Sequence, residues 1–197
     1  KIDSRALIPR PETEILVDKI VKKLKPQMRP GFHLWDLCTG SGCIGIALKK
    51  SLPDLCVTLS DLSKDALSLA RENICLNSVQ VEVLEGDFLN PFQGSKADFV
   101  VSNPPYVSTS EWASLDPSVR LYEPKTALCG GEEGFDFYER LQRELPQFLN
   151  PKAQVFLEIG AGMGEGIEKI FSHGPWGSKQ LLSDWSGKSR FFFLEMQ

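Results

Sequence analysis

The sequence lacks the cysteine pairs and histidine clusters that would indicate a disulfide framework or a metal site. It has five cysteines, an odd number, and none of them forms a Cys-x-x-Cys pair. Its two histidines, His33 and His173, lie far apart in the chain. We therefore expect neither disulfides nor a bound metal, and we expect the protein to work in the reducing environment of the cytoplasm.

Long apolar runs are also missing. The longest is Phe191–Leu194, which has only four residues, whereas a helix needs about 20 residues to cross a bilayer. We therefore expect no membrane segment and no secretory signal. The chain starts at Lys1 and not at a methionine, so we expect an N-terminal piece of the protein to be missing from it.

Basic residues are too few to give the whole chain a positive surface. The net charge is −4, and residues 1–30 hold eight basic but only four acidic residues, which leaves the rest of the chain strongly acidic. Because duplex binding normally requires a basic face, this composition does not favour a nucleic-acid partner. We interpret the cluster of Lys19, Lys22, Lys23 and Lys25 as the solvated face of a helix.

Apolar residues make up 42% of the chain and charged residues 24%, which is typical of one globular domain. Hydrophobic periodicity predicts an α/β fold with a mostly parallel, seven-stranded sheet, helices on both faces and a C-terminal antiparallel hairpin. The stretch 107–134 is predicted to be a long loop that is functional or mobile. The expected strands are 32–38, 55–61, 79–84, 97–103, 154–160, 179–185 and 190–196, and the expected helices are 13–25, 43–52, 63–76, 135–149 and 163–172.

A glycine-rich turn lies between the first expected strand and the helix that follows it. Gly40, Gly42 and Gly45 match the pattern Gly-x-Gly-x-x-Gly, which lets a ligand approach the backbone at a helix N-terminus. Asp61 ends the next strand, where a carboxylate can bind both ribose hydroxyls of an adenosine. The pattern predicts a nucleoside cofactor, and both NAD and S-adenosylmethionine fit it.

Asp36 favours S-adenosylmethionine over NAD. It precedes Gly40 by four residues, and a carboxylate there suits a cationic amino group, which NAD lacks. We expect this cofactor to lie across Cys38–Gly42, with Asp87 and Phe88 beside the adenine. The predicted cofactor-binding residues are Asp36, Cys38, Thr39, Gly40, Ser41, Gly42, Asp61, Asp87, Phe88 and Asn103.

A second segment, Glu158-Ile-Gly160-Ala-Gly162-Met-Gly164, also combines an acid with several glycines after a strand. No acid-ended strand follows it in a β-α-β unit, because Asp184 lies just before a hairpin turn. We interpret this segment as a tight strand-to-helix turn rather than as a second cofactor site.

The strand 97–103 ends in Asn103-Pro104-Pro105-Tyr106. Two prolines can simply terminate a strand, but this explains neither the asparagine nor the tyrosine. The carbonyl of Pro104 and the side-chain oxygen of Asn103 can converge on an –NH₂ group, which donates two hydrogen bonds. Tyr106 offers a flat face for a planar group. The turn therefore predicts a site for a planar amide or an exocyclic amine, with Asn103, Pro104 and Tyr106 as catalytic residues.

The glycine turn, the acid-ended strand, the sequence Gly-Asp-Phe at 86–88 and the Asn-Pro-Pro-Tyr turn together resemble the class I S-adenosylmethionine-dependent methyltransferases that methylate nitrogen. The segments Ile8–Glu14 and 119–131 further resemble the HemK/PrmC family, which methylates the glutamine of the Gly-Gly-Gln motif in peptide-chain release factors. One departure is Cys38, where that family usually has glycine. The resemblance implies a Rossmann-like class I fold, S-adenosylmethionine as cofactor and release factors as protein partners.

The resemblance also implies an N-terminal helical domain. Residues 1–12 are expected to be a connector from that domain, and residues 13–197 the methyltransferase domain of a monomer. Arg10 and Glu12 either line the mouth of the active site or pair with surface charges. The predicted substrate-binding residues are Asn103, Pro104, Pro105, Tyr106, Arg10 and Glu12.

Three other functions remain open from the sequence. The first is methylation of adenine N6 in DNA or RNA, which would require base flipping and a basic groove. The second is methylation of a glutamine in a ribosomal protein. The third is cofactor binding without catalysis, which would leave the Asn-Pro-Pro-Tyr turn unexplained.

Overall fold

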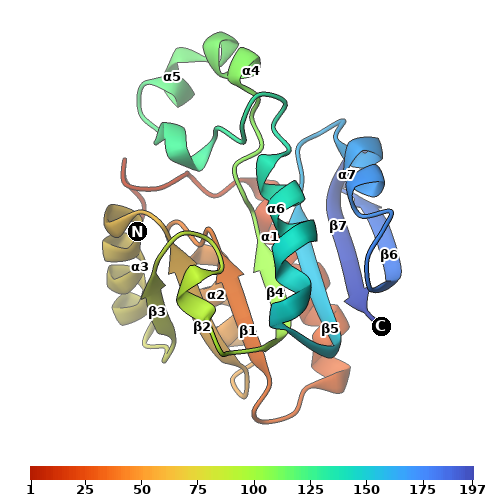
Figure 1. The fold of residues 1–197 in the computed structure, drawn as a ribbon. Coiled ribbons are helices and arrows are strands. Elements are labelled where there is room, and N and C mark those ends of the chain that lie inside the picture. The colour runs from red at the N-terminus through yellow and green to blue at the C-terminus, as the bar shows by residue number, and fades with distance from the viewer.

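The computed structural model describes residues 1–197 and is built around one seven-stranded sheet (Figure 1). The strands are β1 His33–Leu37, β2 Cys56–Asp61, β3 Glu82–Glu85, β4 Ala97–Ser102, β5 Leu149–Glu158, β6 Trp176–Ser183 and β7 Ser189–Met196. Their order across the sheet is β3-β2-β1-β4-β5-β7-β6. β1 to β5 run parallel, whereas β7 runs antiparallel to both β5 and β6. The predicted mostly parallel sheet with a C-terminal antiparallel hairpin is confirmed.

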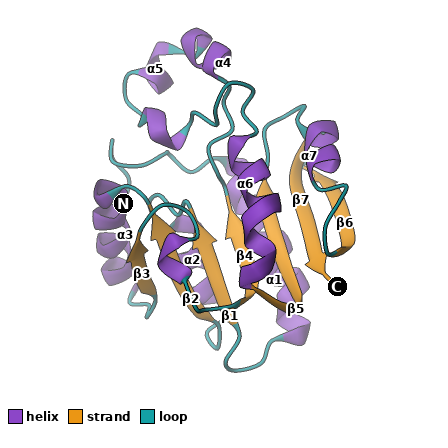
Figure 2. Ribbon diagram, in the orientation of Figure 1, coloured by secondary structure: helices purple, strands orange, loops and turns teal.

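Helices cover both faces of this sheet (Figure 2). They are α1 Pro11–Leu24, α2 Cys43–Ser51, α3 Lys64–Asn77, α4 Thr109–Ser114, α5 Pro117–Arg120, α6 Asp136–Glu144 and α7 Gly164–Ile170, with 3₁₀ turns η1 Lys25–Gln27, η2 Asn90–Phe92, η3 Lys125–Ala127 and η4 Leu145–Phe148. α1, α2 and α3 bury a cluster of 18 residues on one face, and α6 and α7 help to bury 21 residues on the other. None of the helices combines the length and the apolar character that crossing a membrane requires.

Local sequence signals set the ends of these helices. Proline suits the first turn of a helix, where its missing N–H has no partner, and α1 begins at Pro11. Ser63 caps α3, because its hydroxyl oxygen accepts a hydrogen bond from the backbone N–H of Ala66 at 3.2 Å. Pro146 ends the regular part of α6 in the turn η4. Each expected helix is present, although the end of 135–149 is this 3₁₀ turn.

Some predictions about the elements were wrong. β3 begins at Glu82 rather than at residue 79, because this edge strand pairs only with the last four residues of β2. β5 begins at Leu149 rather than at residue 154, and β6 begins at Trp176 rather than at residue 179. The stretch 107–134 is not a plain loop, since α4, α5 and η3 lie within it and form a lobe above the carboxyl ends of the parallel strands (Figure 1). A reciprocal capping box between Ser108 and Glu111 stabilises α4, which has only six residues.

Candidate functional site

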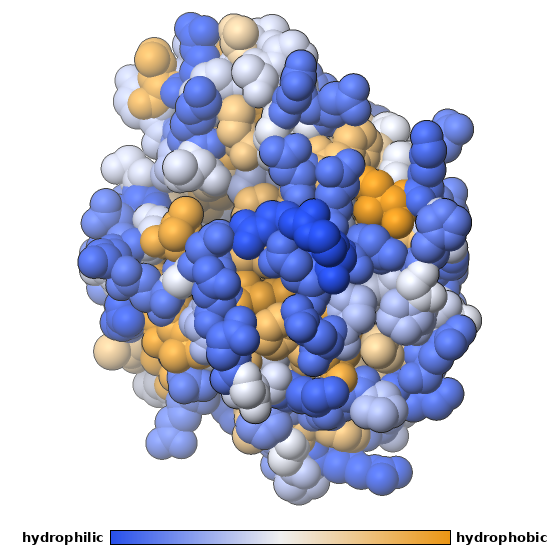
Figure 3. Space-filling view, in the orientation of Figure 1, coloured by the Kyte–Doolittle hydropathy of each residue, from blue (hydrophilic) through white to orange (hydrophobic).

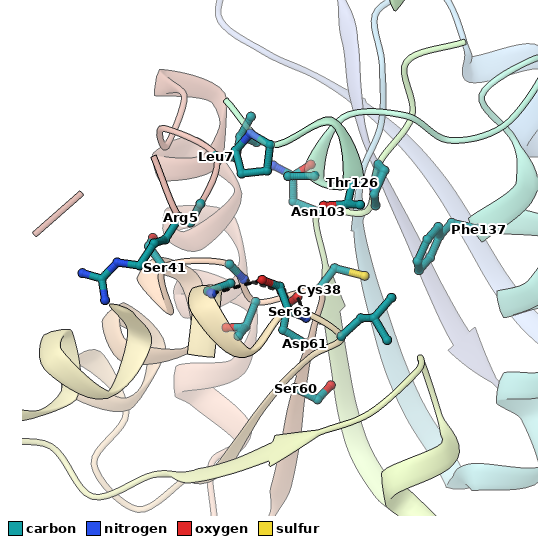
Figure 4. Close-up of a pocket in the computed structure, with 18 of the residues that line it drawn as sticks. Arg5, Leu7, Cys38, Ser41, Ser60, Asp61, Ser63, Asn103, Thr126 and Phe137 are labelled. Carbon is teal, nitrogen blue, oxygen red and sulfur yellow. Dashed lines mark hydrogen bonds between the residues drawn. The ribbon is translucent and has the colours of Figure 1, made fainter. Parts of the chain in front are cut away.

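A cavity of about 570 Å³ lies at the carboxyl ends of the parallel strands, between the sheet and the lobe (Figure 4). Its volume is usual for a small-molecule site, and open α/β sheets bind ligands at this end of their strands. The glycine turn, the loop after β3, α6, the N-terminal segment and the lobe all contribute walls. The lining includes Arg5, Leu7, Cys38, Thr39, Gly40, Ser41, Asp61, Asp87, Phe88, Asn103, Pro105, Thr126, Phe137 and Arg140.

Asp36 holds the glycine turn from below. Its side chain is fully buried, and its Oδ2 accepts hydrogen bonds from the Thr39 hydroxyl at 2.6 Å and the Gly45 backbone N–H at 2.9 Å. A side chain at Gly45 would collide with Leu59, so the close approach of helix to strand requires glycine there. Burial raises the pKa of Asp36 to about 7. Neither Asp36 nor Gly42 lines the cavity, and their direct contact with a cofactor stays a prediction.

Asp61 and Cys38 face the cavity from the ends of β2 and β1 (Figure 4). The carboxylate of Asp61 accepts hydrogen bonds from the backbone N–H groups of Gly40 and Ser63, each at 2.9 Å, while burial raises its pKa. Cys38 has φ 56°, a left-handed conformation that favours glycine. Burial raises the pKa of the Cys38 thiol, so this group is a neutral part of the wall rather than a nucleophile.

The Asn-Pro-Pro-Tyr turn divides between the cavity and the protein interior. Asn103 and Pro105 line the cavity, whereas Pro104 and Tyr106 are not part of its lining. Tyr106 is half-buried and packs against the larger apolar cluster, so close to Gly160 that an added Cβ there would lie 3.0 Å from its ring. Burial raises the pKa of Tyr106 to about 12. The catalytic roles of Asn103, Pro104 and Tyr106, and the substrate contact of Pro105, stay predictions.

Glu158 is a buried carboxyl group beside this turn that sequence reasoning did not assign to the site. It is 2% exposed, and its Oε2 accepts a hydrogen bond from the Thr13 hydroxyl at 2.8 Å. Burial raises its pKa to about 7 and the charge of Glu12 adds to this, while Thr13, Arg190 and the Asn103 amide act in the opposite direction. The sequence offered one signal, the acid that opens the second glycine segment. That segment is the predicted strand-to-helix turn, joining β5 to α7.

Arg10 and Glu12 form ion pairs and do not line the cavity. The Nη2 atom of Arg10 lies 2.7 Å from Oε1 of Glu123, a buried residue of the lobe. Oε1 of Glu12 lies 3.6 Å from Nη2 of Arg190 on β7. The first pair ties the N-terminal segment to the lobe that covers the site. Contact of Arg10 or Glu12 with a substrate stays a prediction.

Gly130 fixes the end of the lobe against the Asn-Pro-Pro-Tyr turn. Its backbone N–H donates a hydrogen bond to the Val107 carbonyl at 2.9 Å. A Cβ at Gly130 would lie 2.5 Å from the carbonyl oxygen of Pro105 and 2.8 Å from the Cα of Tyr106. These neighbours are backbone atoms, which cannot rotate away as a side chain can.

Gly130→Ala is therefore expected to lower the free energy of unfolding by about 2 kcal/mol, because the turn and the lobe must separate to admit a methyl group. Chemical denaturation of the purified variant measures this. The matched control is Gly177→Ala, since the nearest atom to a Cβ there belongs to the flexible side chain of Gln197, 3.3 Å away. Equal stability of the two variants would contradict the close packing described here.

Comparison with known proteins identifies relatives of the whole chain. A sequence profile described as "Methyltransferase small domain" matches residues 11–115. The chain is 39% identical over 200 residues to the "Release factor glutamine methyltransferase" of Bacillus cereus, a match that covers 100% of this chain and 71% of that protein.

Two solved structures are similar in fold. The protein-(glutamine-N5) methyltransferase (release factor-specific) from Alicyclobacillus acidocaldarius is 26% identical, with a TM-score of 0.61, and the match covers 100% of this chain and 99% of that one. A T. thermophilus 16S rRNA N2 G1207 methyltransferase, solved with AdoMet and guanosine, is 16% identical with a TM-score of 0.68. That match covers 96% of this chain and 44% of that one. The second likeness shows that both chains share the class I methyltransferase fold, as predicted.

Proposed function

This chain belongs to the release factor glutamine methyltransferase family, and we propose that it transfers a methyl group from S-adenosylmethionine to the side-chain amide nitrogen of the glutamine in the Gly-Gly-Gln motif of peptide-chain release factors. The observation that carries this proposal is the Asn-Pro-Pro-Tyr turn, whose Asn103 lines a cavity of cofactor size. The names of the full-length relatives support the same substrate.

The residues around the cavity fit S-adenosylmethionine. Asp61 presents a carboxylate that can accept ribose hydroxyl groups, and Phe88 and Phe137 provide apolar walls for an adenine. Beneath the turn, Oδ1 of Asp36 is buried without a hydrogen-bond partner, which fits a carboxyl group that lacks a cationic partner, although Asp36 does not line the cavity in this structure. The neighbour from T. thermophilus, solved with AdoMet, supports this choice of cofactor.

The bound cofactor supplies an electrophilic methyl group, and the task of the chain is to hold the acceptor amide and stabilise charge on it. An amide nitrogen is a poor nucleophile, because its lone pair is delocalised into the carbonyl group. The side-chain oxygen of Asn103, which lines the cavity, would accept a hydrogen bond from one N–H of the substrate amide. The carbonyl of Pro104, which does not line the cavity in this structure, stays the predicted acceptor for the other. These hydrogen bonds strengthen as positive charge develops on nitrogen, which favours the transition state over the bound substrate. Transfer of the methyl group would make one N–H proton of the amide acidic, and this proton would leave to water.

A protein substrate must also be recognised outside the cavity, since a single glutamine is far smaller than a standard interface of about 800 Å² per partner. The lobe presents apolar side chains to solvent (Figure 3). Leu121 and Tyr122 are 69% and 71% exposed there. We propose that the lobe takes part in binding the release factor.

We also propose that residues 1–12 are a connector to the catalytic unit 13–197, and that the protein is a cytoplasmic monomer.

Adenine in DNA or RNA is the competing substrate, because its exocyclic amine would suit the same pair of acceptors. Incubation with methyl-labelled S-adenosylmethionine separates the two, with a release factor in one reaction and DNA or RNA in parallel ones. We expect label in the release factor and none in the nucleic acids. Label in nucleic acid alone would contradict the proposal.

A further inference from the structure

α6 forms a charged contact with the loop that follows β3. The guanidinium of Arg140 binds the carboxylate of Asp87 through two hydrogen bonds, Nη1 to Oδ1 at 3.0 Å and Nη2 to Oδ2 at 3.1 Å. Both residues line the cavity. A two-point contact of this kind fixes the orientation of the carboxylate, which a single exposed ion pair does not.

Phe88, the next residue along the loop, has a backbone conformation that is unusual for a bulky side chain. Its φ is 57°, in the left-handed region, although its ring is buried. Such a conformation persists only where the surrounding structure holds it. The centre of the Arg140 guanidinium lies 4.6 Å from the centroid of the Phe88 ring. The ring of Phe137 packs edge-to-face against the Phe88 ring, with 5.4 Å between the two centroids.

α6 thus holds two successive loop residues, one by a fork of hydrogen bonds and the other by cation–π and aromatic contacts. Arg140 takes part in both contacts. The same helix provides Phe137 to the cavity wall beside them.

We propose that Arg140 is a positioning residue for cofactor binding, which clamps Asp87 and Phe88 in the arrangement that forms the adenine end of the cavity. This inference rests on the proposed function, because it takes S-adenosylmethionine as the ligand. Arg140 acts through its two neighbours and need not touch the cofactor.

Isothermal calorimetry with S-adenosylhomocysteine tests the clamp without relying on catalysis. We expect Arg140→Ala to raise the Kd about tenfold, the size of effect expected from losing a charged hydrogen-bonded contact. Arg140→Lys keeps the charge but not the planar fork, so its Kd should stay well above that of the wild type. 5′-Methylthioadenosine keeps the adenosine of this ligand but lacks the amino-acid group. Because the clamp acts at the adenine end, Arg140→Ala should raise the Kd of this ligand by the same factor.

Arg143→Ala is the matched control, since Arg143 lies on the same helix, is 66% exposed and pairs with Glu144. Its Kd should equal that of the wild type. If Arg140→Ala fails to fold, as judged by its thermal transition, Arg140→Lys carries the test. Wild-type affinity in the folded Arg140 variants would overturn the clamp alone. A wild-type protein that binds NAD but not S-adenosylhomocysteine would overturn the proposed cofactor, and the clamp with it.

Discussion

Asn103→Ala is expected to reduce the kcat of methyl transfer by about tenfold or more, while the affinity for S-adenosylhomocysteine stays nearly unchanged. The side-chain oxygen of Asn103 is one of the two acceptors assigned to the substrate amide. Its contribution grows as the nitrogen becomes positive, so its loss acts on the transition state, as the loss of an oxyanion-hole donor does in other enzymes. Steady-state kinetics with a release factor, together with calorimetry of the cofactor product, measures both quantities.

A suitable control is Asn150→Ala. This variant also removes a side-chain amide, which donates a hydrogen bond to Asp98 at 2.8 Å. Asn150 does not line the cavity. Its kcat should remain close to that of the wild type. Full activity in the Asn103 variant would show that the acceptor argument is wrong.

Glu158→Gln is expected to change how stability depends on pH. The pKa of Glu158 is raised from 4.5 to about 7, so between these values the folded state holds a proton that the unfolded state has released. The free energy of unfolding of the wild type therefore falls as pH rises from about 4.5 to 7, by an amount on the order of 3 kcal/mol from this group. Glutamine cannot titrate and can still accept the Thr13 hydrogen bond. The free energy of unfolding of the variant should thus lie closest to the wild-type value near pH 5 and exceed it most near pH 8.

Denaturation curves recorded from pH 5 to 8 measure this difference. Part of the decrease in the free energy of unfolding with pH should remain in the variant, because the pKa of Asp36 is also raised to about 7. Glu165→Gln, at an exposed position on α7, is the control and should leave the slope unchanged. If the free energy of unfolding depended on pH in the same way for the wild type and the Glu158 variant, burial would not raise the pKa of Glu158.

Much of the fold could be predicted because each buried element carries its own periodic signal. The glycine turn and the Asn-Pro-Pro-Tyr turn could also be recognised, since both depend on residues that are close in the sequence. The six-residue helix α4 was missed, because it follows no apolar periodicity, although Ser108 and Glu111 already had capping-box spacing.

The surroundings of the site could not be read from local sequence. Thr13 and Glu158 are 145 residues apart in the chain, and their contact exists only after α1 packs beside β5. The same holds for Arg140 and Asp87, which belong to α6 and the loop after β3. Local patterns therefore predicted many of the residues that line the cavity more readily than the residues that hold them in place.

The most direct test of the proposed function is to locate the transferred methyl group. A release factor treated with this protein and S-adenosylmethionine is digested, and its peptides are fragmented by mass spectrometry. The proposal predicts one methyl group on the side-chain amide of the glutamine in the Gly-Gly-Gln motif, and none in a release factor whose motif carries glutamate instead. A methyl group on any other residue, or equal methylation of the glutamate variant, would contradict it.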